Sequence, residues 1–180
     1  SLLGIILTSP ILILVSVLLA VSLRGNPIFF QQRTGRLGHL FFIYKFKTMN
    51  DRRDKNGQLL CDADRITKIG SLIRKTSIDE LPQLFNVLMG HMSLVGPRPN
   101  LYNQTDLMEL RDQMGVYAVR PGITGLAQIS KIDMSTPKKL AETDAKMLQN
   151  FNTWNYFRLI LLTVLGNGYG DRMKNDFKVQ

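Results

Sequence analysis

The chain has 180 residues with a formal net charge of +9, and 44% of its residues are hydrophobic. This length is enough for one domain with a buried core. The single cysteine, Cys61, excludes an internal disulfide framework. A secretory signal peptide would need a basic stretch followed by a small-residue cleavage site, and the sequence shows neither.

The first segment, residues 1–23, contains no charged residue. As a helix it would rise roughly 34 Å, enough to cross the hydrocarbon core of a bilayer. Ser9 and Pro10 interrupt it, and proline removes a backbone donor and bends a helix. Two alternatives follow: a re-entrant helix that dips into one leaflet, or a kinked helix that still spans. The basic residues that come next favour a cytoplasmic position for the rest of the chain: Arg24, Arg33 and Arg36.

Hydrophobic periodicity predicts an α+β fold that is mainly helical. After a turn at 25–27, alternation of polar and apolar residues predicts a strand at 43–49, and a polar loop follows at 51–62. Helical spacing then predicts helices at 66–75, 77–89, 101–114, 137–151 and 154–165. The last helix begins with aromatic residues and is too short to span a membrane. It is either an amphipathic helix at the membrane interface or a core helix.

Basic residues concentrate in the middle of the chain. Residues 45–75 carry nine lysines and arginines against four aspartates. Such an excess suits phosphates, anionic lipid headgroups or nucleic acid, and charge alone does not choose among them. The alternative is a solvated surface that aids solubility.

Adjacent acids at Asp79 and Glu80 are the first candidate catalytic residues. Ser77 and Glu80 have the spacing of a capping box, so one interpretation is a structural helix start. In the functional interpretation the same helix start keeps Asp79 ionised, as a carboxylate nucleophile must be. Glu80 would then accept a proton or help hold a metal. Mg²⁺ bound by Asp79 and Glu80 would screen the repulsion between a carboxylate and a diphosphate.

Two proline-flanked arginines are candidate phosphate ligands. Arg98 stands in Gly96-Pro97-Arg98-Pro99, and Arg120 precedes Pro121, Gly122, Thr124 and Gly125. A rigid turn fixes the direction of a guanidinium, whose fork matches phosphate oxygens. The glycines predict a close approach of the backbone to a ligand. Structural turns with surface arginines are the alternative.

Four motifs stand in one order: Ser-Pro in an apolar segment, Thr-Ser-Ile-Asp-Glu-Leu-Pro-Gln, Gly-Pro-Arg-Pro, and Arg-Pro-Gly-Ile-Thr-Gly-Leu-Ala-Gln. Together they resemble the bacterial sugar transferase family, the monotopic phosphoglycosyl transferases. The likeness covers nearly the whole chain and is greatest to the minimal members. It implies a re-entrant membrane helix at 1–23, broken at Ser9 and Pro10. It also implies a catalytic domain at 24–180 on the cytoplasmic face of the bacterial inner membrane.

The resemblance also implies a reaction. Asp79 would attack the β-phosphorus of a UDP-sugar, expel UMP and form an aspartyl phosphosugar, which polyprenol (undecaprenyl) phosphate then takes up. Glu80 would handle protons or support Mg²⁺. Arg74, Arg98 and Arg120 would bind phosphate. The loop after Arg120 would border the nucleotide, and Asp144 is a further candidate.

The resemblance makes the expected donor UDP-N,N'-diacetylbacillosamine, with UDP-N-acetylglucosamine and UDP-galactose as alternatives. The reaction would be the first membrane step in assembling a glycan for a glycoprotein or polysaccharide. Expected partners are the donor, the acceptor, membrane lipid and downstream glycosyltransferases, with no nucleic acid. Two other hypotheses are a non-catalytic basic module that binds membranes peripherally and a scaffold that spans the membrane.

Overall fold

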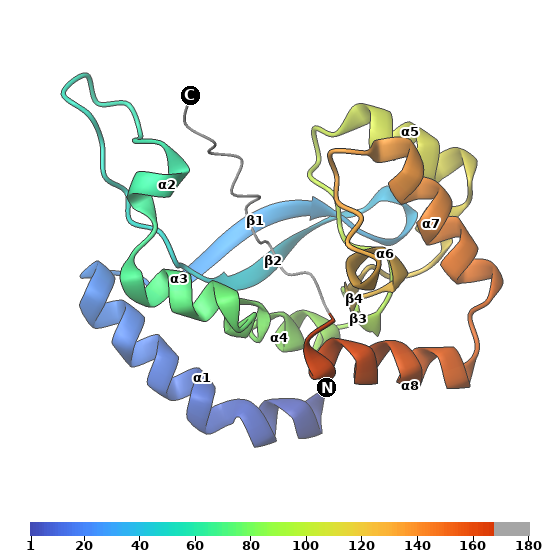
Figure 1. Ribbon diagram of the computed structural model, residues 1–180, viewed down its shortest axis with the longest axis horizontal. Coiled ribbons are helices and arrows are strands. Elements are labelled where there is room, and N and C mark those ends of the chain that lie inside the picture. The colour runs from blue at the N-terminus through green and yellow to red at the C-terminus, as the bar shows by residue number, and fades with distance from the viewer. Residues whose placement is uncertain (168–180) are drawn as a thin grey trace.

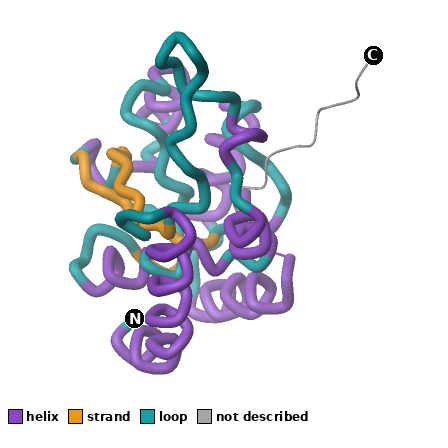
Figure 2. The backbone as a smooth tube through the Cα atoms, turned by 90° about the vertical axis from the view of Figure 1, so that its left-hand side faces the viewer, coloured by secondary structure: helices purple, strands orange, loops and turns teal. Residues whose placement is uncertain are grey.

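The structure is a computed structural model that describes residues 1–167. The last part of the domain expected at 24–180 lies outside these residues. The described part is mainly helical, as the periodicity predicts, with two small two-stranded sheets. Figure 2 shows the strands reaching one side of the molecule, with helices and loops making up the rest.

The N-terminal helix α1 runs from Leu2 to Leu23 and bends along its length (Figure 1). Pro10 lies inside the helix and has no N–H for the carbonyl of Ile6. The Ser9 hydroxyl donates to that carbonyl at 2.8 Å, so the polar group stays bonded in an apolar segment. The segment therefore stays one helix through Ser9 and Pro10 and does not divide into two. Among residues 1–167, α1 is the one helix long and apolar enough, at a mean hydropathy of 2.7, to cross a membrane.

Strands β1 (Ile28–Thr34) and β2 (Leu40–Phe46) form an antiparallel hairpin above α3 and α4 (Figure 1). The alternating pattern predicts one strand at 43–49. The observed β2 begins three residues earlier, and β1 was missed because Ile28-Phe29-Phe30-Gln31-Gln32 does not alternate. Within β2, Lys45 points to the opposite side of the hairpin from Tyr44 and Phe46.

Short helices follow the hairpin: α2 (Asp62–Arg65), α3 (Lys68–Lys75) and α4 (Gln83–Leu88). Helix α3 confirms the prediction at 66–75, and the Thr67 hydroxyl caps it by accepting from the Gly70 N–H at 2.9 Å. The predicted single helix at 77–89 is wrong. A 3₁₀ turn at Ile78–Glu80 precedes α4, because Ser77 has a left-handed backbone (φ 57°) and makes no side-chain cap.

The rest of the fold packs α5 (Thr105–Gln113) against α7 (Pro137–Gln149) and ends with α8 (Thr153–Leu162) (Figure 1). These three helices confirm the predictions at 101–114, 137–151 and 154–165. Strand β3 (Ser93–Val95) precedes α5, and strand β4 (Gly122–Thr124) and the short helix α6 (Leu126–Ile129) lie between α5 and α7. The two strands pair in parallel, which the sequence pattern does not predict. 3₁₀ turns occur at Arg36–Gly38 and Val116–Ala118, and a π-helical turn at Thr163–Asn167.

Both halves of α1 contact the remainder of the domain. Near its start, Gly4 lies against Leu84 of α4. Its later residues, Leu12, Val15 and Leu19, form a buried cluster with Phe46 of β2 and Ile73 of α3. The N-terminal segment is therefore packed along the domain over its length.

Candidate active site

A cleft of about 610 Å³ opens between the β1–β2 hairpin and helix α3, and we call it the charged cleft. Its lining combines acidic, basic and aromatic side chains: Asn26, Ile28, Phe29, Phe30, Gln31, Lys45, Phe46, Lys47, Thr48, Met49, Asp51, Asp62, Arg65, Arg74 and Asp79. Asp79 is 5% exposed and lies in this wall. The predicted nucleophile thus stands in a cavity large enough for a small molecule.

The turn that carries Asp79 is fixed by its neighbours. Ser77, with its left-handed backbone, reverses the chain after α3, and the amide N–H groups of Glu80 and Leu81 close the 3₁₀ turn. Ile78 and Leu81 pack against the cluster that contains α1 and α3. The flanking side chains of the acid pair are thus held in the apolar core.

Glu80 meets two cations from distant parts of the chain. Its Oε1 atom lies 3.0 Å from Lys45 Nζ and 3.4 Å from Arg98 Nη2. All three side chains are largely buried, with 12%, 7% and 19% exposed for Glu80, Lys45 and Arg98. We call these three residues the Glu80 triad. Lys45 was counted in the sequence only as part of the basic stretch, although its alternation with Tyr44 and Phe46 marked it as facing another side.

Arg74 lines the charged cleft with Asp79, as expected for a phosphate ligand near the acid. Its Nε donates to Thr48 Oγ1 at 2.7 Å, and Nη2 lies 3.0 Å from Met49 Sδ. A Cβ atom on Gly70 would lie 2.0 Å from the Thr48 carbonyl oxygen, so glycine is needed there for α3 to approach this segment. This close packing holds the Arg74 side chain over the cleft wall.

The Arg98 turn is held by the parallel β3–β4 pair. The Gly96 N–H donates to Thr124 O and the Gly122 N–H to Pro97 O, both at 2.9 Å. A Cβ on Gly122 would lie 2.0 Å from Gly96 N, so its glycine permits contact between two backbones. Gly125 likewise approaches Gly96 O, at 2.4 Å for an added Cβ. Sequence analysis expected these glycines to approach a ligand, whereas here they approach Gly96.

The loop after Arg120 is buried at Pro121, Gly122, Thr124 and Gly125. Arg120 itself is exposed, and its guanidinium lies against Gly90, in the turn after α4. Asp79 and Glu80 precede that same helix. The structure therefore places Arg98 beside the acid pair and Arg120 at the other end of α4.

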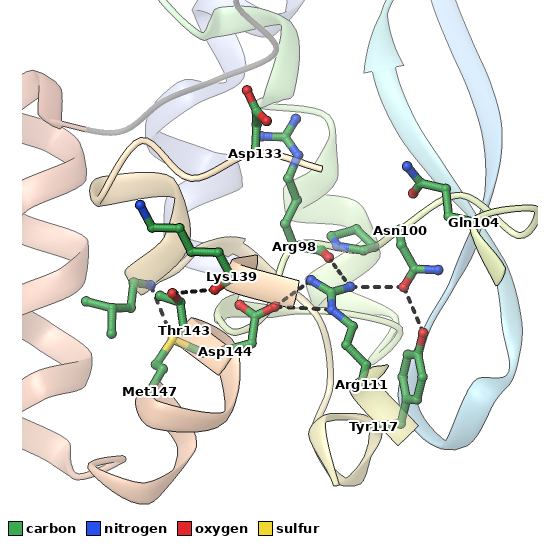
Figure 3. A network of polar contacts seen from close by, with 12 residues as sticks. Arg98, Asn100, Gln104, Arg111, Tyr117, Asp133, Lys139, Thr143, Asp144 and Met147 are labelled. Atoms are coloured by element: carbon green, nitrogen blue, oxygen red, sulfur yellow. Dashed lines mark hydrogen bonds and ion pairs between the residues drawn. The ribbon is translucent and has the colours of Figure 1, made fainter. Parts of the chain in front are cut away.

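Asp144 lies behind the Arg98 turn in a buried network (Figure 3). Its Oδ2 accepts from Arg111 Nη2 at 2.6 Å and Nε at 3.1 Å, and both residues are 1% exposed. Arg111 Nη1 donates to the carbonyl of Arg98 at 2.8 Å and to Asn100 Oδ1 at 2.9 Å. Figure 3 shows the Arg98 side chain pointing away from this network, toward Asp133. Sequence analysis missed Arg111, whose place in an ordinary amphipathic helix gave no signal.

Burial raises the pKa of the Asp144 carboxyl above its ordinary value, and the Arg111 guanidinium opposes that shift. The Oδ1 atom of Asp144 is buried without a hydrogen-bond partner, in agreement with this direction. At the rim of the charged cleft, the pKa of the exposed Asp51 carboxyl is shifted in the other direction. The hydrogen bond from Lys47 lowers the pKa of Asp51 below its ordinary value.

A second cavity, of about 530 Å³, runs between α1, the hairpin and α4, and we call it the apolar groove. Its lining is almost entirely hydrophobic: Ile5, Ser9, Leu12, Ile13, Ser16, Val17, Ile28, Phe30, Tyr44, Phe46, Pro82 and Phe85. Ile28, Phe30 and Phe46 line both cavities. The charged cleft and the apolar groove therefore share a wall.

Within residues 1–167, no group of three or more His, Cys, Asp or Glu side chains is arranged to hold a metal ion. Glu80 Oε1 already faces two cations. Mg²⁺ commonly binds through one or two carboxylates together with substrate phosphates and water. The residues present fit that mode of binding better than an all-protein site.

The sequence profile of a family described as bacterial sugar transferase matches residues 1–167. The uncharacterised sugar transferase EpsL of Bacillus subtilis is 48% identical over 141 residues, covering 78% of this chain and 69% of the relative.

Two further relatives carry names that state a reaction. A UDP-glucose:undecaprenyl-phosphate glucose-1-phosphate transferase of Klebsiella pneumoniae is 38% identical over 168 residues, 88% of this chain. A UDP-N-acetylgalactosamine-undecaprenyl-phosphate N-acetylgalactosaminephosphotransferase of Aeromonas hydrophila is 37% identical over 175 residues, 92% of this chain. The chain spans 36% and 41% of the lengths of these two relatives.

Proposed function

Since the chain belongs to the bacterial sugar transferase family, we propose that it transfers a sugar 1-phosphate from a UDP-sugar to polyprenol phosphate and releases UMP. The Klebsiella and Aeromonas relatives are named for transfers of this type to undecaprenyl phosphate. One observation carries the proposal: Asp79 lines a charged cleft that shares a wall with an apolar groove. A water-soluble diphosphate and a lipid acceptor need such adjoining surfaces.

The charged cleft is the proposed donor site. Lys45, Arg65 and Arg74 bring positive charge to its wall, and guanidinium groups bind phosphate oxygens through paired donors. The aromatic edge at Phe29 and Phe30 offers a surface for a base or sugar ring. The diphosphate would lie near Asp79, with the uridine and sugar extending along the cleft.

The apolar groove is the proposed site for the isoprenoid chain of the acceptor. Its walls are hydrocarbon and aromatic, so burying an apolar chain there removes it from water. The shared residues Ile28, Phe30 and Phe46 mark where the acceptor phosphate would pass toward Asp79. Both substrates would thus reach one carboxylate from different sides.

The proposed chemistry has two steps on Asp79. A carboxylate oxygen attacks the β-phosphorus of the donor, the bond from that phosphorus to the bridging oxygen breaks, and UMP leaves with the electron pair. A phosphate oxygen of the acceptor then attacks the same phosphorus, forms the lipid diphosphate-sugar and frees the Asp79 carboxylate. Glu80, which Lys45 and Arg98 hold in one place, would accept the proton that a singly protonated acceptor phosphate gives up as it attacks.

Positive charge would stabilise the phosphorane-like transition state and the leaving UMP. Arg98 reaches Glu80 and so stands near the reacting phosphorus in this proposal. Arg120 remains a proposed contact of the outer parts of the donor, reached from the other end of α4. The buried loop Pro121–Gly125 would act indirectly, by holding the Arg98 turn through its contacts with Gly96. Asp144 acts indirectly, through Arg111 and the Arg98 carbonyl.

Mg²⁺ is the proposed cofactor, bound to the donor diphosphate and supported by Asp79 with Glu80 beside it. When bound it would neutralise phosphate charge and lower the repulsion between the carboxylate and the donor. Asp51 and Asp62, which also line the charged cleft, increase the negative charge that a cation would offset.

We also propose that α1 dips into one leaflet and returns. Contacts of both halves of α1 with α3, α4 and the hairpin support this, because a spanning helix would carry one end away from the domain. Helix α8 exposes Trp154, Phe157 and Leu161, at 79%, 62% and 58%, and these side chains would lie at headgroup depth. The domain would then lie on the cytoplasmic face of the inner membrane.

The donor sugar is a finer part of the proposal. UDP-N,N'-diacetylbacillosamine stays the donor expected from the sequence, while the relatives are named for glucose and N-acetylgalactosamine donors. The product would feed glycosyltransferases that extend a glycan for a polysaccharide or glycoprotein.

The test is UMP release by the purified full chain in detergent with Mg²⁺, undecaprenyl phosphate and a panel of five donors: UDP-diacetylbacillosamine, UDP-glucose, UDP-galactose and the two UDP-N-acetylhexosamines. One donor should support turnover, and Asp79→Asn should lower it by at least about 10³-fold. With donor alone, a covalent route should release about one equivalent of UMP per enzyme, whereas direct displacement should release none.

Mass spectrometry of the peptide that contains Asp79 should then find an added sugar phosphate. A membrane-bound chain that releases no UMP with any donor would favour the non-catalytic module. Turnover without a donor-only burst would retain the transferase and reject the aspartyl intermediate.

A further inference from the structure

Asn86 is a fully buried amide in the middle of α4 that lines neither the charged cleft nor the apolar groove. Both ends of its side chain are used by strand β2. Its Oδ1 accepts from the Tyr44 N–H at 3.0 Å, and its Nδ2 donates to the Phe42 carbonyl at 2.7 Å. A buried side chain on one element thus satisfies two backbone groups of another.

These two groups belong to the edge of β2 that faces away from β1. In the described part of the chain, β2 has β1 as its only strand partner, so its second edge needs other donors and acceptors. Asn86 supplies one acceptor, for the Tyr44 N–H, and one donor, for the Phe42 carbonyl. These two groups flank Ile43, and a residue of a parallel strand would bond to the same two groups. The amide therefore fixes α4 to one register position of β2.

The backbone of Asn86 makes a second connection. Its carbonyl accepts from the N–H groups of His91 and Met92 at 3.0 and 3.2 Å. Met92 leads directly into β3, and the turn that carries Arg98 follows. Asn86 therefore ties together the strand that carries Lys45, the helix that follows Glu80, and the segment that leads to Arg98.

We propose that Asn86 is a positioning residue for the Glu80 triad. Lys45 directly follows Tyr44, whose N–H Asn86 holds, so fixing that register sets where the Lys45 ammonium meets Glu80. Helix α4 has only six residues and is too short to hold its own place. The inference rests on the proposed function, because turnover is its first measurement.

The test is a double-mutant cycle on UMP release, with rates expressed per folded molecule. Asn86→Asp keeps the shape of the side chain and removes the donor to Phe42. It should lower kcat about tenfold or more in the otherwise unchanged protein, with donor KM changed less than about threefold. In a Glu80→Gln background the same change should cost less than about twofold, because the residue it positions has already lost its carboxylate.

Leu84→Ala is the matched control, since Leu84 is buried in the same helix and lies against Gly4 of α1. Its effect on stability should be large, and its effect on kcat should be equal in both backgrounds. Equal effects of Asn86→Asp in the two backgrounds would overturn the proposal, as would an unchanged kcat. If Asn86→Asp does not fold, Asn86→Ser, whose shorter side chain gives up the donor to the Phe42 carbonyl, enters the same cycle.

A measurement without turnover separates this inference from the proposed function. In a Cys61→Ser protein, a short bis-maleimide should join Lys45→Cys to Glu80→Cys, entering from the charged cleft that Lys45 lines. Adding Asn86→Ser should slow that reaction at least about fivefold, while adding Leu84→Ala should not, if Asn86 sets the distance between β2 and the turn. Equal rates in all three proteins would reject the positioning role even if no donor is found.

Discussion

The Glu80 triad and the Arg111–Asp144 pair both join a carboxylate to basic side chains, but they lie in different surroundings. Glu80 shares one oxygen between Lys45 and Arg98, and Lys45 lines the charged cleft. Asp144 has one cation, in contact at 2.6 Å, and the pair is sealed between α5 and α7 (Figure 3). The two clusters contain the same kind of ion pair. They differ in access to a cavity, so the Glu80 triad can meet substrate whereas the Arg111–Asp144 pair can only hold the Arg98 turn.

The largest expected effect is the loss of stability when the buried Arg111–Asp144 pair is broken. Arg111→Met should lower the free energy of unfolding by about 3–5 kcal/mol, because Asp144, Asn100 and the Arg98 carbonyl lose their donors in the interior. Denaturant unfolding in detergent, followed by circular dichroism, measures it. Adding Asp144→Leu should recover part of the loss. A loss below about 1 kcal/mol would mean that the pair does not hold the fold.

The triad should respond in the opposite way. Glu80→Gln should lower kcat for UMP release about 10²-fold, because a group that handles protons is removed. It should lower the free energy of unfolding less than Arg111→Met does, because glutamine keeps an acceptor oxygen for Lys45 and Arg98. The control is Glu109→Gln, an exposed acid on α5, which should change neither quantity. A stability loss as large as that of Arg111→Met would erase the contrast between the two clusters.

A smaller effect sharpens the role of Arg98. Arg98→Lys keeps the charge and loses the planar fork, so kcat/KM for the donor should fall about tenfold. Arg53→Lys, in the exposed loop that leads to α2, should leave kcat/KM unchanged. Full activity in Arg98→Lys would show that only charge is needed beside Glu80.

The smallest effect concerns pH. Burial raises the native pKa of Asp144, so between its ordinary value of 3.8 and that raised pKa the native state binds more protons than the unfolded state. The contribution of this carboxyl to stability is then greatest at low pH and is lost as pH rises through that interval. Unfolding of wild type and Asp144→Asn across the acid range measures it. A relative stability of the wild type that rises with pH would mean that Arg111 outweighs burial.

Local patterns predicted much of the fold. The helices at α3, α5, α7 and α8 were found because apolar residues recur at helical spacing and each helix packs one face on the domain. The family match confirms the resemblance drawn from the four motifs. The expected capping box at Ser77 failed, because tertiary packing puts that residue in a left-handed turn where its side chain makes no cap.

The order of residues specifies which chemical groups are available: an apolar segment interrupted by Ser9 and Pro10, adjacent acids at Asp79 and Glu80, and arginines next to prolines at Arg98 and Arg120. Which of these groups meet depends on how the folded segments pack. Lys45 and Arg98 reach Glu80 across 35 and 18 residues of chain, and the β3–β4 pairing that holds Arg98 joins strands of three residues each. Such contacts leave no periodic trace in either segment, because their energy comes from surfaces that adjoin only after the chain has folded.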